Sequence, residues 1–117
     1  MSEAYILFRE GQKRLRTGLT AQATVPLEKA KRLEPAKASI REALGIAYFR
    51  LARWQDAERE FRAIVEELSP TDHYAHYALG RALEQQGRTT EANGHYKLAR
   101  SLRPQSQQYA ARVMDLD

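Results

Sequence analysis

Residues 73–104 read HYAHYALGRALEQQGRTTEANGHYKLARSLRP, and the spacing of their small, aromatic and proline residues occurs twice earlier in the chain. Four series carry the repeat: Gly11, Gly45 and Gly80; Ala23, Ala57 and Ala92; Leu27, Phe61 and Tyr96; Pro35, Pro70 and Pro104. Their members lie 34 or 35 residues apart. A period of this length is typical of chains whose units stack on one another, because one unit alone cannot bury its apolar face.

Within the second unit, the register of the repeat changes by one residue. The glycine, alanine and large apolar series step by 34 and then 35, whereas the prolines step by 35 and then 34. The extra residue therefore lies between Ile64 and Pro70. We expect a local irregularity there and no change of fold.

The apolar residues between these positions follow a helical period. Leu44, Tyr48 and Leu51 fall at i, i+4 and i+7 of one helix, and Phe61 and Leu68 lie on a second. Each unit is therefore predicted to be a pair of helices, and no segment has the pattern of a strand. We expect inner breaks at 16–18, 51–53 and 86–88, and outer breaks at the three prolines, which cannot continue a helix interior.

Length and composition limit the class of protein. A chain of 117 residues is the size of one domain, and the absence of cysteine removes disulfides and thiolate metal sites. No run approaches the ~18 apolar residues that span a membrane. The opening residues, Met1-Ser2-Glu3, lack the basic charge of a signal peptide. We predict a soluble, cytoplasmic protein without membrane contact.

The net charge of +4 is unevenly distributed. Residues 1–37 contain eight Lys or Arg against four Asp or Glu, whereas residues 38–72 contain five against seven. The basic first unit could bind an acidic protein, nucleic acid or an anionic lipid. The alternative is that these side chains form an ordinary solvated helix surface.

Taken together, these residues make the chain similar to the tetratricopeptide repeats over most of its length. The second unit matches with Leu44, Gly45, Tyr48, Ala57 and Phe61, the third with Leu79, Gly80, Ala92, Tyr96, Ala99 and Pro104, and the first with Gly11, Ala23, Leu27, Ala30 and Pro35. The resemblance implies an all-α fold, a right-handed superhelical solenoid of antiparallel helix pairs with about seven helices. Small residues are expected to let paired helices approach closely, and Phe61 and Tyr96 to fill the space between units.

The resemblance also divides the chain into parts. Residues 1–117 form one domain with repeat one at 4–37, repeat two at 38–72, repeat three at 73–106 and a capping helix at 107–117. In the capping helix, Tyr109, Val113 and Leu116 are expected to share one face. The alternative is that the chain is the front of a longer array.

Two residues depart from the helical pattern. Pro26 falls inside the second helix of repeat one, where it removes a backbone donor and should kink or shift that helix. Gly94 lies in the middle of a helix, at a cost of about 1 kcal/mol relative to Ala.

In this family, the first helix of each unit lines an inner, concave surface. The positions that point into it are Tyr5, Phe8, Gln12 and Leu15, then Ser39, Glu42, Ile46 and Phe49, then Tyr74, Tyr77, Arg81 and Glu84. The helical period supports this independently, because Ile46 and Phe49 lie on a different side of their helix from Leu44 and Tyr48. The predicted partner-binding groove consists of Tyr5, Phe8, Gln12, Glu42, Ile46, Phe49, Arg50, Tyr74, Tyr77, Arg81 and Glu84.

Aromatic and Arg side chains are the types that dominate binding energy at interfaces. If they form a groove, Phe49→Ala or Tyr77→Ala should weaken partner binding by more than ~1 kcal/mol and leave stability almost unchanged. The alternative is that several of these aromatics pack against neighbouring helices, in which case stability falls equally.

Some members of the family clamp the C-terminal carboxylate of a bound tail with Lys, Asn and Arg side chains. The corresponding positions here are Phe8, Gln12, Ala43, Tyr74 and Ala78. The clamp is therefore absent, and an apolar or aromatic segment, extended or helical, is the expected ligand.

The sequence offers little for catalysis. His73 and His76, with Asp72 beside them and His95 farther along, are the one group with metal-ligand composition. Asp72 is better explained as a helix N-cap, and His76 as a packing residue. Neither a glycine-rich phosphate loop nor a nucleophile elbow is present. We predict a protein that is not an enzyme and has neither a metal site nor a cofactor.

The leading interpretation is a non-catalytic adaptor or scaffold that binds a polypeptide segment in the concave groove. The alternative is a nucleic-acid-binding helical-repeat protein that uses the basic first repeat, where Tyr5 and Phe8 lie near Arg9 and Gln12. Self-association through the ends of the solenoid, where Ile6 is apolar, is a third hypothesis. The residues do not identify the partner.

Overall fold

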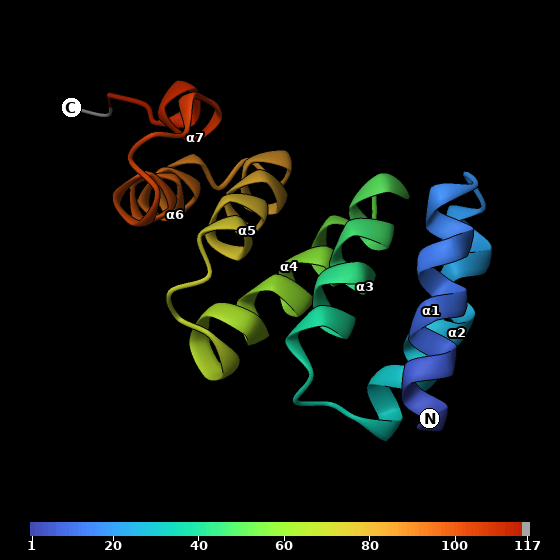
Figure 1. Cartoon of the computed structure of the whole chain (residues 1–117). Coiled ribbons are helices and arrows are strands. Elements are labelled where there is room, and N and C mark those ends of the chain that lie inside the picture. The colour runs from blue at the N-terminus through green and yellow to red at the C-terminus, as the bar shows by residue number, and fades with distance from the viewer. Residues whose placement is uncertain (116–117) are drawn as a thin grey trace.

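The computed structural model describes residues 1–115 and shows a stack of helix pairs (Figure 1). The pairs are α1 (Glu3–Arg16) with α2 (Thr20–Leu33), α3 (Ala38–Arg50) with α4 (Trp54–Ala63), and α5 (His73–Gln85) with α6 (Thr89–Leu102). A π-helical turn, η1 (Ile64–Leu68), extends α4, and a short helix, α7 (Gln107–Arg112), follows α6. All regular structure within residues 1–115 is helical, which confirms the predicted all-α fold.

The pairs follow one another along an elongated molecule of 49 × 24 × 22 Å. Pro35, Pro70 and Pro104 lie in the three turns that lead from one pair to the next element. In the part of the chain that the structure describes, no helix is long and apolar enough to cross a membrane.

The two helices of a pair approach closely at a glycine. An ideal Cβ built on Gly45 of α3 would lie 2.6 Å from the Phe61 ring of α4, so the ring leaves no room for a larger residue. The other two pairs have the same contact between a glycine and a large apolar side chain. The prediction that small residues set the spacing of the paired helices is confirmed.

Tight turns join the helices of each pair at the predicted inner breaks. Gly18 and Gly87 occupy two of these turns with φ of 80° and 76°, in the left-handed region that glycine adopts without strain. Ala52 occupies the same place in the second repeat with φ of 59°. Its Cβ makes this conformation unfavourable, so the α3–α4 turn is strained.

The extra residue of the second repeat is accommodated in η1. The Ser69 amide donates to the Ile64 carbonyl at 2.7 Å, which is the i→i+5 bond of a π-helix. Ile64 and Val65 remain buried within this turn. The predicted irregularity between Ile64 and Pro70 is therefore confirmed, and it preserves the core.

Pro26 lies within α2 without breaking it, since the helix runs from Thr20 to Leu33. Because proline has no amide hydrogen, the Gln22 carbonyl one turn earlier loses its helical partner. The Arg14 guanidinium of α1 donates to that carbonyl at 2.9 Å. The acceptor freed by the proline is thus satisfied by the paired helix.

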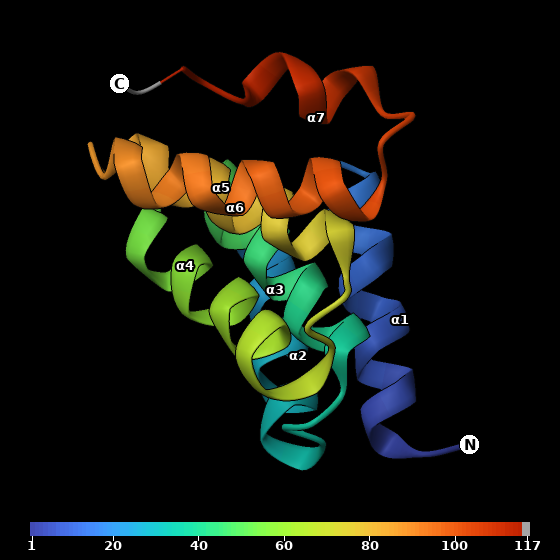
Figure 2. The same ribbon diagram turned by 90° about the vertical axis from the view of Figure 1, so that its left-hand side faces the viewer.

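After α6 the chain turns back, and α7 lies alongside α6 (Figure 2). α7 is shorter than the predicted capping helix, because it ends at Arg112 and Val113 is extended with φ −66° and ψ 129°. The Asn93 side chain of α6 holds this extended segment, accepting from the Met114 amide at 2.7 Å and donating to the Met114 carbonyl at 2.8 Å. Leu116, predicted on the face of the capping helix, lies outside the described residues.

Candidate functional site

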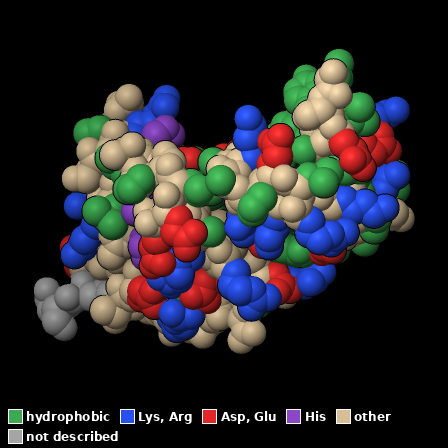
Figure 3. Space-filling model, turned by 90° about the horizontal axis from the view of Figure 1, so that it is seen from below, with side chains coloured by type: hydrophobic (Ala, Val, Ile, Leu, Met, Phe, Trp, Pro, Cys, Tyr) green, Lys and Arg blue, Asp and Glu red, His purple; other side chains and the backbone are tan. Residues whose placement is uncertain are grey.

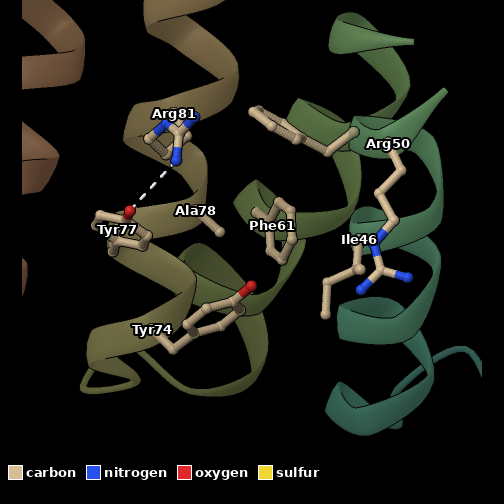
Figure 4. A pocket seen from close by; sticks show the side chains of 8 residues that line it. Ile46, Arg50, Phe61, Tyr74, Tyr77, Ala78 and Arg81 are labelled. Atoms are coloured by element: carbon tan, nitrogen blue, oxygen red, sulfur yellow. Dashed lines mark hydrogen bonds between the residues drawn. The ribbon is translucent and has the colours of Figure 1, made fainter. Parts of the chain in front are cut away.

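A hollow between α3 and α5, which we call the central hollow, lies over the Phe61 ring of α4 (Figure 4). It contains about 500 Å³ of space, including space open to solvent. Its lining residues are Ile46, Phe49, Arg50, Phe61, Tyr74, Tyr77, Ala78 and Arg81. All of these except Phe61 and Ala78 were predicted to line the groove, so the fold brings predicted residues of two repeats together.

The walls and floor of the central hollow are apolar. α3 buries the side that carries Tyr48 and leaves Ile46 and Phe49 half-buried on another side. Phe61 of α4 closes the bottom and is 1% exposed. The Tyr74 ring of α5 lies edge-on to Phe61, with the centroids 6.3 Å apart. The prediction that α3 is apolar on two sides is confirmed.

Two arginines stand on opposite sides of the central hollow, Arg50 on α3 and Arg81 on α5 (Figure 4). The Arg81 guanidinium donates to the Tyr77 hydroxyl at 3.3 Å, and its Cζ lies 5.2 Å from the centroid of the Phe49 ring. The Arg50 guanidinium donates to the Leu15 carbonyl at 3.4 Å. Within residues 1–115, no carboxylate forms an ion pair with either arginine.

Arg81 also has an unsatisfied donor. Its Nε is buried and has no hydrogen-bond partner among the described residues. A buried donor without a partner loses the free energy of its hydration, which is about 1–3 kcal/mol.

An acidic side chain, Glu42, lines the neighbouring hollow between α1 and α3. Glu42 of α3 lies one turn before Ile46, and Asp72 caps α5 by accepting from the Ala75 amide at 3.0 Å, as predicted. Burial, with Asp72 nearby, raises the pKa of the Glu42 carboxyl. Burial, with Glu42 nearby, raises the pKa of the Tyr74 hydroxyl. The central hollow therefore has two arginines and no carboxylate among its lining residues, and the acidic Glu42 borders the hollow next to it.

The predicted residues of the first repeat line two further hollows between α1 and α3. Phe8 and Gln12 line one of them together with Glu42, Ile46 and Arg50. Tyr5 and Phe8 line the other, near the N-terminal ends of the two helices. Because neighbouring hollows share lining residues, the three form one row across α1, α3 and α5.

Tyr77 and Glu84 of α5 contact side chains of α7. Tyr77 is 6% exposed, its ring centroid lies 5.0 Å from that of Tyr109, and its hydroxyl accepts from Gln108 at 3.0 Å. The Glu84 carboxylate accepts from Arg112 at 3.2 Å. Because the Tyr77 ring belongs to the core beneath α7, Tyr77→Ala is instead expected to lower stability.

Phe61 had been assigned only to the scaffold. The sequence does contain a signal for its second role. Gly45 has no side chain, so the aromatic ring opposite it can reach across α3 to the hollow on the other side. Which part of the ring then borders a hollow depends on the angle between repeats, and the repeat pattern does not contain that angle. Ala78 lines the hollow because it faces the same gap from α5.

The histidines have separate partners. His73 Nδ1 lies 2.7 Å from the Tyr109 hydroxyl, whereas His76 Nδ1 lies 3.1 Å from His95 Nδ1. Within residues 1–115, no group of three or more His, Cys, Asp or Glu side chains could hold a metal ion. The structure thus separates His73 and His76, which the sequence had placed in one group.

His76 instead has the structural role that Arg41 has in the second repeat. Arg41 donates to the Pro35 carbonyl at 3.0 Å and to Glu60 at 3.2 Å. His76 lies 2.7 Å from the carbonyl of the corresponding proline and 3.1 Å from His95, which stands where Glu60 stands. Each of these side chains joins the turn between two repeats to the second helix of its own repeat.

Of the basic residues of the first repeat, Arg16 borders one hollow at α1 and Lys37 the other, and charges of both signs surround the rest. Arg9, Lys13 and Arg16 are exposed on α1, and Arg14 is paired with Glu10 at 3.0 Å. On the face shown in Figure 3, Lys and Arg side chains are interspersed with Asp and Glu side chains along the lower part of the molecule. A mixed surface of this kind offers no continuous track for a phosphate backbone.

The fold and the site define a short solenoid of helix pairs with a row of hollows along the first helix of each pair. The model of the tetratricopeptide repeat family matches residues 7–73 and, again, residues 42–107. The chain belongs to the tetratricopeptide repeat family, whose fold generally mediates protein–protein interaction.

Solved structures share this fold at low sequence identity. The first TPR of Spaghetti (RPAP3), bound to the HSP90 peptide SRMEEVD, is 22% identical with a TM-score of 0.90, over 95% of this chain and 87% of that one. The Arabidopsis OM64 TPR domain is 20% identical with a TM-score of 0.88, over 93% and 89%. MamA is 23% identical with a TM-score of 0.90, over 94% and 64%. A search of curated proteins found no match.

Proposed function

We propose that the chain is a non-catalytic adaptor or scaffold that binds a segment of another polypeptide along the row of hollows on α1, α3 and α5. The central hollow carries the proposal, because Ile46, Phe49 and Tyr74 remain accessible there although the paired helices bury most of their other large apolar residues. Aromatic and Arg side chains around a concave apolar surface are the features of a binding hot spot.

The row of hollows favours an extended or helical segment over a single buried group. Phe8 borders both hollows at α1, and Ile46 and Arg50 border the neighbouring pair. One bound segment can therefore contact three helices in succession. Such a contact would extend over all three repeats, and residues far apart in the sequence would bind the same segment.

The ligand is expected to differ from that of the RPAP3 structure, which holds an HSP90 peptide. Positions that would need Lys, Asn or Arg for a carboxylate clamp are Phe8, Gln12, Ala43, Tyr74 and Ala78 in this chain. Four of them instead border the hollows with apolar surface, namely Phe8, Ala43, Tyr74 and Ala78. This supports a segment that inserts apolar side chains.

Affinity capture with crosslinking from the native host tests the proposal with two matched isoleucines. Ile46 lines two of the hollows, whereas Ile6 is 55% exposed on α1 and lines none of those described. We expect Ile46→Ala to lose partners that both the parent chain and Ile6→Ala retain. The melting temperature of each variant shows whether the loss reflects binding or folding.

Retention of the same partners by Ile46→Ala would contradict the proposal. Recovery of RNA alone, in an amount that falls steeply with added salt, would favour the nucleic-acid alternative instead.

A further inference from the structure

The chemistry of the central hollow indicates what kind of segment it binds. We infer that it recognises a polypeptide segment in which one large apolar side chain is flanked by a carboxylate, with the apolar group between α3 and α5 and the carboxylate on Arg81. This inference rests on the proposed function and adds the chemical class of the ligand.

The apolar half of the inference follows from the lining. Ile46 and Phe49 on one side, Tyr74 and Ala78 on the other, and Phe61 at the bottom present carbon to the space between them. Figure 4 shows Ile46 on one side and Tyr74 and Ala78 on the other, with Phe61 between them. A leucine or aromatic side chain placed there leaves water and contacts three helices at once.

The acidic half follows from the two arginines. Most arginines of α4 and its neighbours are already paired, as Arg62 is with Glu58 at 2.9 Å and with Glu91 at 2.6 Å. Arg50 and Arg81 differ, because within residues 1–115 they have no carboxylate partner and border an apolar hollow. A guanidinium beside apolar surface binds a carboxylate through charge-assisted hydrogen bonds, which are stronger than neutral ones.

Arg81 is held in place for this task. Its guanidinium donates to the Tyr77 hydroxyl at 3.3 Å and lies over the Phe49 ring at 5.2 Å, so two fixed groups orient it. The guanidinium hydrogens that Tyr77 does not accept are then available to an incoming acceptor. Little conformational entropy remains to be lost when a carboxylate binds.

The charged side chains that line the central hollow are both arginines, whereas Glu42 lines the neighbouring hollow between α1 and α3. The acidic residue of the segment is therefore expected at Arg81.

An NMR titration of the ¹⁵N-labelled full chain at about 0.15 M salt tests the inference with three capped tripeptides. The probe is acetyl-Asp-Leu-Asp-amide, which works in either chain direction. Acetyl-Asn-Leu-Asn-amide removes the charge, and acetyl-Asp-Ala-Asp-amide removes the large apolar group. We expect the probe to bind about tenfold more tightly than either control and to shift the Nε–H signal of Arg81.

Two arginine variants separate a specific contact from general charge. Arg81→Gln should abolish the preference for the Asp probe over the Asn control. Arg100→Gln, which removes an exposed arginine of α6 that does not line the hollow, should leave the preference unchanged.

The outcomes distinguish this inference from the proposed function. If the Asn control binds as tightly as the Asp probe, the carboxylate is not recognised and the inference is overturned, while peptide binding in the hollow stands. If a uridine hexanucleotide shifts the signals of α3 and α5 and none of the peptides does, both proposals are overturned. If no probe shifts these signals, the inference is overturned and the capture experiment decides the proposed function separately.

Discussion

The strained turn between α3 and α4 allows a stabilising substitution, Ala52→Gly. Ala52 has φ of 59°, whereas glycine occupies the same position in the other two repeats. The left-handed conformation costs an L-residue about 1–2 kcal/mol. Replacing Ala by Gly also costs about 0.4–1 kcal/mol of stability, because glycine has more conformational freedom in the unfolded chain. The net gain is about 0.5–1 kcal/mol, or about 2–4 °C in melting temperature for a domain of this size.

Urea unfolding followed by circular dichroism measures this gain as a higher midpoint with an unchanged slope. Ala36→Gly is the matched control, since Ala36 is exposed in the turn between α2 and α3 and does not have a positive φ. The control should lose about 0.4–1 kcal/mol, because only the entropy term acts there. If Ala52→Gly loses stability by the same amount as Ala36→Gly, the turn is not strained and the reasoning is refuted.

Three further predictions concern the third repeat. Gly94→Ala should stabilise α6 by about 1 kcal/mol in urea unfolding, because an added Cβ at Gly94 meets no atom within 4 Å; a loss of stability would contradict this. Tyr77→Ala should lower the free energy of unfolding by about 3–5 kcal/mol, since the ring is buried beneath α7; an unchanged melting temperature would return Tyr77 to the groove. Burial, with the charges of His76 and Arg62 nearby, lowers the pKa of the His95 imidazole. Below about pH 6.5 the unfolded chain therefore binds more protons at this position than the folded chain does. The free energy of unfolding is unaffected by His95 above that pH and decreases as the pH falls through it. His95→Gln should reduce the loss of unfolding free energy between about pH 7 and pH 5.5, measured by urea unfolding at the two pH values.

The repeat pattern predicted the fold because it records contacts that each unit makes in the same way. The contact between Gly45 and Phe61 recurs in every pair, so its spacing in the sequence reveals the pairing of helices. The register shift between Ile64 and Pro70 likewise predicted an irregularity, which the structure shows as η1. The kind of irregularity could not be predicted, since a loop could have accommodated the one extra residue as well as a π-helical turn does.

The candidate site was predicted only in part, because its boundaries depend on contacts outside the repeat. The period places Tyr74, Tyr77 and Arg81 on the same surface of α5, and the structure places all three at the central hollow. The period contains no information on the path of the residues after Pro104, because that segment does not repeat. The extended segment that Asn93 holds at Met114 is a contact of this chain alone.

The short helix α7 packs against α5 next to the central hollow. α5 presents Tyr74, Ala78 and Arg81 to the hollow, and on its other side Glu84 is engaged by Arg112 of α7. Tyr77 connects the two sides, because its hydroxyl accepts from both Arg81, at 3.3 Å, and Gln108, at 3.0 Å. α7 thereby helps to fix the guanidinium that faces the hollow. A segment bound at Arg81 is therefore expected to continue toward α3 and α1, where the hollows are open, since α7 already covers the other side of α5.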